Sequence, residues 1–197
     1  MKIILASSNV KKAVEIRDIL KTFEVVCYSD MIPAFEIVEN GKSFQENALI
    51  KAKAVYAKIQ GIMNESFWVL SDDSGLVVDA LGGEPGIFSA RYSGEGSDVA
   101  NLQKVISKLQ EKGINESRAY FCAASAIVGE KGDYCVHGFA YGKVITTPRG
   151  QHGFGYDPIF IHTNHSVTFA EMDRLQKNTL SHRFKSLELI QILLRYL

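Results

Sequence analysis

The sequence predicts an α/β fold in which helices flank a mixed, twisted sheet on both sides. Three observations favour it: the chain opens as strand, loop, helix and strand, two long β-like runs follow one another over residues 118–145, and an amphipathic stretch ends the chain. Alternating strands and helices are typical of this class. The length of 197 residues predicts one domain over residues 1–197. Within it we expect two lobes with an active-site cleft between them.

The N-terminal segment has the pattern of a strand followed by a helix. Residues 2–6, which are apolar after Lys2, predict a short buried strand. Residues 7–9, Ser-Ser-Asn, are of the types that cap helices, and apolar side chains then recur at helical spacing over residues 13–23. A second strand is expected over residues 25–28.

A second helix is predicted after an irregular stretch over residues 34–42. Ser43 and Glu46 have the spacing of a capping box, which marks the first turn of a helix. Asn47 and Lys51 follow four residues apart, so they lie together on one polar face of that helix.

Strands and loops alternate over the rest of the chain. The apolar run over residues 67–70 predicts a strand that ends at Asp72 and Asp73. The later elements are expected, in order, as a glycine-rich loop over 82–97, a helix from Asp98, a β-hairpin with strands over 118–128 and 134–145, a second glycine-containing loop over 146–155, a short strand over 159–161 and a C-terminal helix over 184–197.

The composition is that of an ordinary globular protein, with 46% hydrophobic and 22% charged residues. Lys plus Arg and Asp plus Glu both number 22, so no excess of cations favours a nucleic acid polymer as partner. No apolar stretch has the length of a membrane span or of a signal peptide, so we expect a cytoplasmic protein without a membrane partner. Cys27, Cys122 and Cys135 match no metal-binding spacing and are expected to be free thiols.

Two adjacent carboxylates, Asp72 and Asp73, follow the buried run over residues 67–70. Such a pair repels itself and is costly to desolvate unless a cation or hydrogen-bond donors meet it. Mg²⁺ binds through one or two carboxylates together with substrate phosphates, and Glu39 is a candidate third acid. The alternative is a strand-to-turn junction and a surface glutamate.

Residues 7–12 join the first strand to the first helix and form a candidate phosphate-binding loop. Backbone N–H groups at a helix N-terminus favour anions, and a lysine one turn into the helix can neutralise a phosphate. The P-loop pattern is absent. The alternative is ordinary capping by Ser and Asn, followed by solvated lysines.

Phe154 lies between two glycines in a loop, where the chain offers it little framework for packing. An aromatic ring in this setting suits stacking on a nucleobase, and Asp157 is held extended because Pro158 follows it. The alternative is a turn with a partly buried Phe. Lys177 and residues 181–183, Ser-His-Arg, offer donors for a base edge or a phosphate, although Ser181 is also a plausible cap for the last helix.

With these clusters in this order, the chain resembles the inosine triphosphate pyrophosphatases, which remove non-canonical purine nucleoside triphosphates from the nucleotide pool. The resemblance covers nearly the whole chain. Its motifs are residues 7–12, 43–48, 72–76, 86–94, 153–158 and 181–183. The chain departs from the family pattern at Ser7, where Thr is usual, at Lys11, where many members have Gly, and at Gln176, where Glu is common.

The resemblance implies a role for each motif. The triphosphate would be bound by Ser7, Ser8, Asn9, Val10, Lys11, Lys12 and Lys51. Mg²⁺ would be held by Glu39 and Asp73, and Asp73 would also be the catalytic proton acceptor for the attacking water. Asp72 would support Asp73, and Ser74 would contact the substrate. Phe154 would stack on the purine, Gly155, Tyr156 and Asp157 would line the nucleoside pocket, and Lys177, His182 and Arg183 would contact the base edge.

The implied reaction is Mg²⁺-dependent hydrolysis of ITP, dITP or XTP between the α and β phosphates, giving the monophosphate and pyrophosphate. The resemblance also implies a homodimer, with Arg91 near the phosphates or the dimer interface. Two other functions stay open: a pyrophosphatase of related architecture that prefers pyrimidine triphosphates, and a non-enzymatic module that binds nucleotides or RNA.

Overall fold

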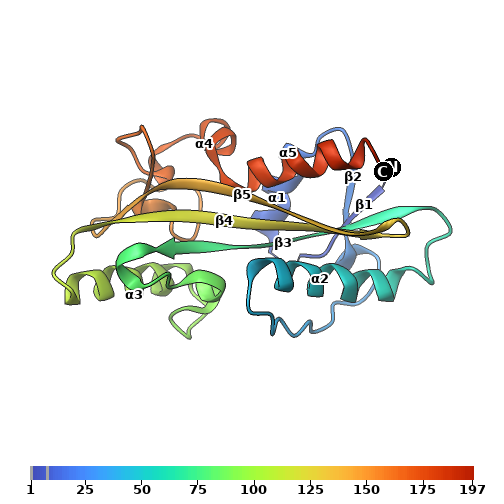
Figure 1. Ribbon diagram of the computed structural model, residues 1–197, viewed down its shortest axis with the longest axis horizontal. Coiled ribbons are helices and arrows are strands. Elements are labelled where there is room, and N and C mark those ends of the chain that lie inside the picture. Colours follow the sequence, from blue (N-terminus) through green and yellow to red (C-terminus); the bar gives the residue numbers. More distant parts are fainter. Residues whose placement is uncertain (1, 8) are drawn as a thin grey trace. The chain divides into compact units, whose positions relative to one another are not determined.

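A computed structural model describes residues 2–7 and 9–197, so the predicted phosphate ligand Ser8 lies outside the described residues. Six strands form one sheet in the order β2-β1-β3-β4-β5-β6 (Figure 1). β1 pairs in parallel with β2 and β3, whereas β5 and β6 are antiparallel, so the sheet is mixed as predicted. The strands are β1 Lys2–Leu5, β2 Glu24–Cys27, β3 Phe67–Val78, β4 Glu116–Gly129, β5 Gly132–Ile145 and β6 Phe160–His162.

Helices connect the strands much as the sequence predicts. The α-helices are α1 Val10–Ile19, α2 Phe44–Ile59, α3 Asp98–Glu111, α4 Arg174–Leu180 and α5 His182–Leu194. Of these only α4 was not expected. Ser43 caps α2 by accepting a hydrogen bond from the backbone N–H of Glu46, at 3.1 Å. The Glu46 carboxylate accepts in return from the N–H of Lys42, one residue before the partner that a standard capping box uses.

The described residues divide into two compact units that share β3, β4 and β5. The first unit lies within Met1–Asp73, Ala123–Gly138 and Arg183–Leu197, and the second comprises Ser74–Cys122 and Phe139–His182. The single domain and the cleft between lobes stay predictions. No helix in the part of the chain that the structure describes combines the length and apolar character needed to cross a membrane.

The first unit has one apolar core on each face of its strands, because successive side chains of a strand point to opposite faces. Ile4 and Val69 pack with α2 on one face. Ile3 and Leu70, their neighbours in sequence, pack with α1 and α5 on the other (Figure 1). This alternation fixes the direction in which each later residue of β3 points.

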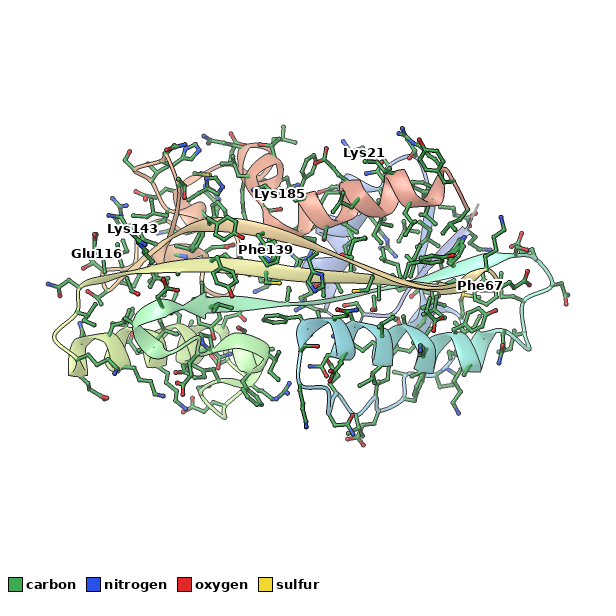
Figure 2. All side chains as sticks on the ribbon, viewed as in Figure 1. Lys21, Phe67, Glu116, Phe139, Lys143 and Lys185 are labelled. Carbon is green, nitrogen blue, oxygen red and sulfur yellow. The ribbon has the colours of Figure 1, made fainter. Side chains whose placement is uncertain are left out.

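The second unit has a core in which the stripe of α3 packs with strand residues of β4 and β6. Leu102, Val105 and Leu109 supply the stripe, as predicted, and Phe121 and Phe160 pack with them. At the surface of this unit, Figure 2 shows Lys143 of β5 beside Glu116 of β4, and the two side chains form an ion pair of 2.6 Å. β4 and β5 follow each other in the chain and are neighbours in the sheet, which confirms the predicted hairpin.

Strand β3 is much longer than predicted. It was expected to end at Asp72 and Asp73, but it continues to Val78, so both acids lie inside the strand. Gly75 also lies inside this strand. A Cβ atom there would lie 2.3 Å from Oγ of Ser89 and 2.4 Å from the carbonyl of Gly86, so the glycine permits the close approach of residues Gly86–Arg91.

Candidate active site

The carboxylates of Asp72 and Asp73 contact different side chains on opposite faces of β3. The side chain of Asp72 points to the same face of β3 as that of Leu70, the face covered by α1 and α5, where it contacts Lys12 and Arg183. The side chain of Asp73 points to the same face of β3 as that of Val69, the face covered by α2, where it contacts Lys51. The two acids therefore have different ion-pair partners, although the charge of Lys12 also acts on Asp73.

Asp72 belongs to a buried network of two carboxylates and two cations. Lys12 Nζ lies 2.8 Å from Oδ2 of Asp72, and Arg183 donates to Oδ1 from Nε at 3.3 Å and to Oδ2 from Nη2 at 3.2 Å. Nη1 of Arg183 donates to Glu15 of α1. Burial alone would raise the pKa of Asp72, but Arg183 and Lys12 outweigh burial and hold it well below its usual range. Asp72 is thus a fixed anion.

Asp73 shares one ammonium with Glu39. Nζ of Lys51 lies 2.7 Å from Oε2 of Glu39 and 3.0 Å from Oδ1 of Asp73. Glu39 comes from the irregular segment before α2, as predicted, and Lys51 comes from the middle of α2. Nδ2 of Asn47, one helical turn before Lys51, lies 3.5 Å from Oδ2 of Asp73. The structure therefore brings together both predicted metal ligands and one predicted phosphate ligand.

The proton affinities in this cluster follow from burial and from the charges around it. Burial raises the pKa of Asp73, and the opposing effects of Lys51 and Lys12 do not cancel it. Burial would lower the pKa of Lys51, but Asp73 and Glu39 together outweigh burial and raise it. Asp73 therefore binds a proton more readily than an ordinary aspartate, which is the property expected of a carboxylate that accepts a proton from water.

The predicted phosphate loop forms the N-terminus of α1. Oδ1 of Asn9 caps the helix by accepting from the N–H of Lys12 at 3.1 Å. Ser7, Asn9 and Val10 line a cavity of about 230 Å³. Lys11 is exposed, while the Lys12 side chain is directed to Asp72. Asn9 thus serves the capping role that the sequence left open, and the contact of this loop with phosphate stays a prediction.

In the second unit, Phe154, Asp157 and Lys177 form one compact group. Nζ of Lys177 donates to Oδ2 of Asp157 at 2.6 Å and lies 4.9 Å from the centre of the Phe154 ring. The same carboxylate oxygen accepts from the N–H of Phe154 at 2.9 Å. Gly153 is required here, because a Cβ atom would lie 2.1 Å from that oxygen. The sequence predicted these three side chains for one pocket, and the structure brings them together.

The other predicted nucleoside-contacting residues have different surroundings. Tyr156 is buried in the apolar core, and its hydroxyl donates to the carbonyl of Ser89 at 2.8 Å. His182 stacks on Phe121, with ring centres 4.8 Å apart. Ser74 is half-buried in β3, directly after Asp73, and Gly155 has a positive φ of 61°. Their contacts with substrate stay predictions.

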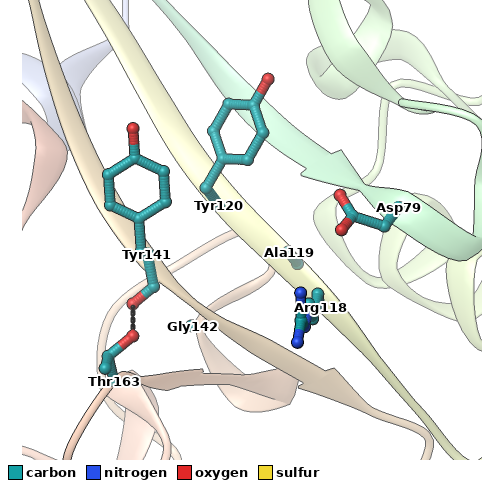
Figure 3. Close-up of a pocket in the computed structure, with 7 residues that line it drawn as sticks. All are labelled: Asp79, Arg118, Ala119, Tyr120, Tyr141, Gly142 and Thr163. Atoms are coloured by element: carbon teal, nitrogen blue, oxygen red, sulfur yellow. Dashed lines mark hydrogen bonds between the residues drawn. The ribbon is translucent and has the colours of Figure 1, made fainter.

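A further cavity of about 430 Å³ lies in the second unit and contains none of the predicted site residues (Figure 3). It lies beside the exposed surface of β4 and β5, where the hydroxyl of Thr163 donates to the carbonyl of Tyr141 at 2.9 Å. The lining residues are Asp79, Arg118, Ala119, Tyr120, Tyr141, Gly142 and Thr163.

Two residues of the acid clusters were not predicted. Glu15 is buried although it is charged, because Arg183 meets it. Its only sequence signal was a glutamate next to the apolar positions of α1. Asn47 is buried beside Asp73, and its Oδ1 accepts from the N–H of Gly41 at 2.9 Å. Its spacing from Lys51 predicted a shared polar face of the helix, but no local signal linked it to an acid cluster.

The motifs of both units match one family of known proteins. The model of the Ham1 family matches residues 3–192. The chain belongs to the Ham1 family. It is 50% identical over 197 residues to the dITP/XTP pyrophosphatase of Campylobacter jejuni subsp. doylei, a match that covers 100% of this chain and 98% of the relative.

Two solved structures of Ham1 proteins support this membership at the level of the fold. The Staphylococcus aureus Ham1 protein has a TM-score of 0.85 and 36% identity, and the match covers 99% of this chain and 98% of the other. The Coxiella burnetii Ham1 protein has the same TM-score and identity over 100% of both chains.

Proposed function

We propose that this chain hydrolyses dITP, ITP and XTP between the α and β phosphates and releases the monophosphate and pyrophosphate. The chain is an enzyme of the class nucleoside triphosphate pyrophosphatase, like its full-length relatives named dITP/XTP pyrophosphatase. The observation that carries the residue assignment is the cluster of Glu39, Lys51 and Asp73, in which two acids surround one cation.

Glu39 and Asp73 fit a divalent cation. Both carboxylates direct an oxygen at the same positively charged atom, Nζ of Lys51, which stands in for a cation between them. Two carboxylates are the share that a protein commonly supplies to Mg²⁺, with substrate phosphates completing the shell. We propose that these two residues hold Mg²⁺, which when bound neutralises charge that develops on the phosphates.

Asp73 is the proposed proton acceptor. Its carboxylate takes a proton from the attacking water as the oxygen of that water approaches the α-phosphorus. The raised pKa of Asp73 suits this step, because a base with a higher proton affinity accepts the proton more readily. Lys12 and Lys51 are proposed to bind phosphate oxygens, and the fixed anion Asp72 keeps Lys12 in position.

Phe154 and Lys177 are the proposed determinants of base selectivity. Stacking on Phe154 holds any base, since every base has a π face. An ammonium has three N–H donors, so Lys177 can keep its bond to Asp157 and also donate to the 6-carbonyl of hypoxanthine or xanthine. Opposite the 6-amino group of adenine this donor stays unpaired, at a cost of about 1–3 kcal/mol.

Arg183 has a second proposed role besides contact with the base edge. Its Nε, Nη1 and Nη2 already donate to Asp72 and Glu15, so the side chain is fixed within the Asp72 network. We propose that it positions Asp72, and through Asp72 the ammonium of Lys12.

A substrate panel tests the function as a whole. Pyrophosphate release is measured with ITP, dITP, XTP, dATP, dTTP and UTP, each with and without Mg²⁺. Preference for the first three in the presence of Mg²⁺ is expected. Preference for dTTP or UTP identifies a pyrimidine enzyme instead, and binding without pyrophosphate release identifies a nucleotide-binding module.

We propose that the protein is a cytoplasmic homodimer. Cys27 and Cys135 are free thiols, which suits a reducing compartment. The rings of Tyr120, Phe139 and Tyr141 form a patch on β4 and β5 with centres 5.7–6.0 Å apart, and Tyr141 is 58% exposed. An exposed aromatic patch is typical of an interface. Light scattering of the wild type and of Tyr141→Arg tests this proposal, since only the variant is expected to be monomeric.

A further inference from the structure

The ammonium of Lys51 occupies the position between the two carboxylates that are proposed to hold the metal. It lies 2.7 Å from Glu39 and 3.0 Å from Asp73, and the side chains of Lys51 and Asp73 are 13% and 12% exposed. These are the distances of charge-assisted hydrogen bonds. The oxygens proposed for Mg²⁺ are therefore engaged by a cation of the protein itself.

A divalent cation cannot simply join this arrangement. It needs the same oxygens, and at such short range it repels the ammonium. Among the described residues, no group of three or more Asp, Glu, His or Cys side chains could hold a metal ion. Two carboxylates fill only part of the shell of a hard cation such as Mg²⁺, and substrate phosphates commonly supply part of the rest. A triphosphate supplies both what the metal lacks and what the ammonium needs, namely anionic oxygens.

The geometry points to Lys51 as a built-in counter-ion of Glu39 and Asp73. Its ammonium occupies their oxygens, and divalent cations do not bind there until a triphosphate binds. The inference rests on the proposed function of these two acids. When the nucleotide arrives, its phosphate oxygens draw the ammonium away on its flexible four-carbon stem, and the freed carboxylates bind the divalent cation. Nucleotide and divalent cation therefore bind with positive coupling, and each raises the affinity for the other by the same factor.

Lys53 provides a matched control on the same helix. It forms an ion pair of 2.8 Å with Asp133, but its side chain is 56% exposed and no predicted metal ligand contacts it in any described ion pair. Lys51→Met and Lys53→Met remove the same charge from α2, so only the position of the charge differs between the two variants.

The test uses Mn²⁺ alone, followed by the electron paramagnetic resonance signal of the free ion. Without nucleotide, Lys51→Met is expected to bind Mn²⁺ about tenfold or more tightly than the wild type, because one unit of positive charge has left the site. Lys53→Met is expected to match the wild type. Equal Mn²⁺ affinity of Lys51→Met and the wild type overturns the inference.

A second measurement separates this inference from the proposed function. An ITP analogue that cannot be cleaved between the α and β phosphates is added, and Mn²⁺ affinity is measured for the wild type, Glu39→Gln and Asp73→Asn. If both substitutions weaken Mn²⁺ binding in the complex but Lys51→Met changes nothing without nucleotide, only the counter-ion role is wrong. If neither substitution matters in the complex, the metal assignment itself is wrong.

Folding is checked on the same samples by circular dichroism. Lys51→Gln is the second variant if Lys51→Met does not fold, since glutamine removes the charge and keeps a hydrogen-bond donor. In whichever variant folds, Mn²⁺ without nucleotide is expected to raise the melting temperature more than it does in the wild type. An equal shift in both proteins contradicts the inference.

Discussion

Asp72 and Asp73 are adjacent in the chain, yet the described ion pairs give their carboxylates different partners: Arg183 and Lys12 contact Asp72, and Lys51 contacts Asp73. Strand geometry separates them, since neighbouring side chains of β3 point to opposite faces. The first acid is a structural anion, and the second is the candidate base. Substitutions at the two positions should therefore have different effects.

Asp73→Asn should abolish activity and leave the fold intact. The amide cannot accept a proton from water, so turnover should fall by roughly 10²–10⁴-fold. The charge of Asp73 is disfavoured by burial, so its removal should cost little stability. Steady-state pyrophosphate release and nucleotide binding by calorimetry check this, with the exposed Asp79→Asn as control. Turnover near that of the wild type would remove Asp73 from the mechanism.

Asp72→Asn should instead destabilise the protein. It leaves the buried guanidinium of Arg183 and the ammonium of Lys12 without their shared anion, and breaking a buried pair typically costs about 3–5 kcal/mol. Urea unfolding of the wild type and the variant measures the difference. A loss below about 1 kcal/mol, the value of a surface ion pair, would mean that this network contributes little to stability.

The contribution of Asp72 to stability should depend on pH in a defined direction. Its pKa is lowered in the folded protein relative to the ordinary value of 3.8, so folding favours the charged form. The stability difference between the wild type and Asp72→Asn is therefore fully present above pH 3.8 and declines as the pH falls through the lowered pKa. Unfolding at pH 8, 6 and 4 should give similar differences. A difference that already shrinks between pH 8 and 6 would contradict a lowered pKa.

Phe154→Ala should weaken nucleotide binding by about 1–3 kcal/mol, the value of stacking one base on an aromatic ring. Phe154→Tyr keeps the ring and should bind nearly as the wild type does. Calorimetric titration with an uncleavable ITP analogue measures both variants. Because Lys177 lies over the same ring, the alanine variant should also reduce the preference for ITP over dATP. Unchanged affinity in Phe154→Ala would exclude stacking at this position.

The sequence predicted the fold class and most elements because their signals are local. The stripe of α3, the caps of α1 and α2 and the hairpin of β4 and β5 all depend on residues close in the chain. The end of β3 was predicted wrongly because two adjacent acids are typical of a turn. They can lie inside a strand here because cations distant in sequence compensate both charges: Arg183, 111 residues away, contacts Asp72, and Lys51 contacts Asp73. Glu15 and Asn47 were missed for the same reason, as their partners are distant in sequence.

The alternation along β3 also restricts how this part of the chain can evolve. One residue inserted or deleted between Val69 and Asp72 would turn each acid toward the partners of the other, while Gly75 would lose its place beside Ser89. Length changes are thus excluded here even where single substitutions are tolerated. Engineered insertions for labels or affinity tags belong elsewhere, for example in the Glu130–Lys131 turn, which no predicted substrate contact involves.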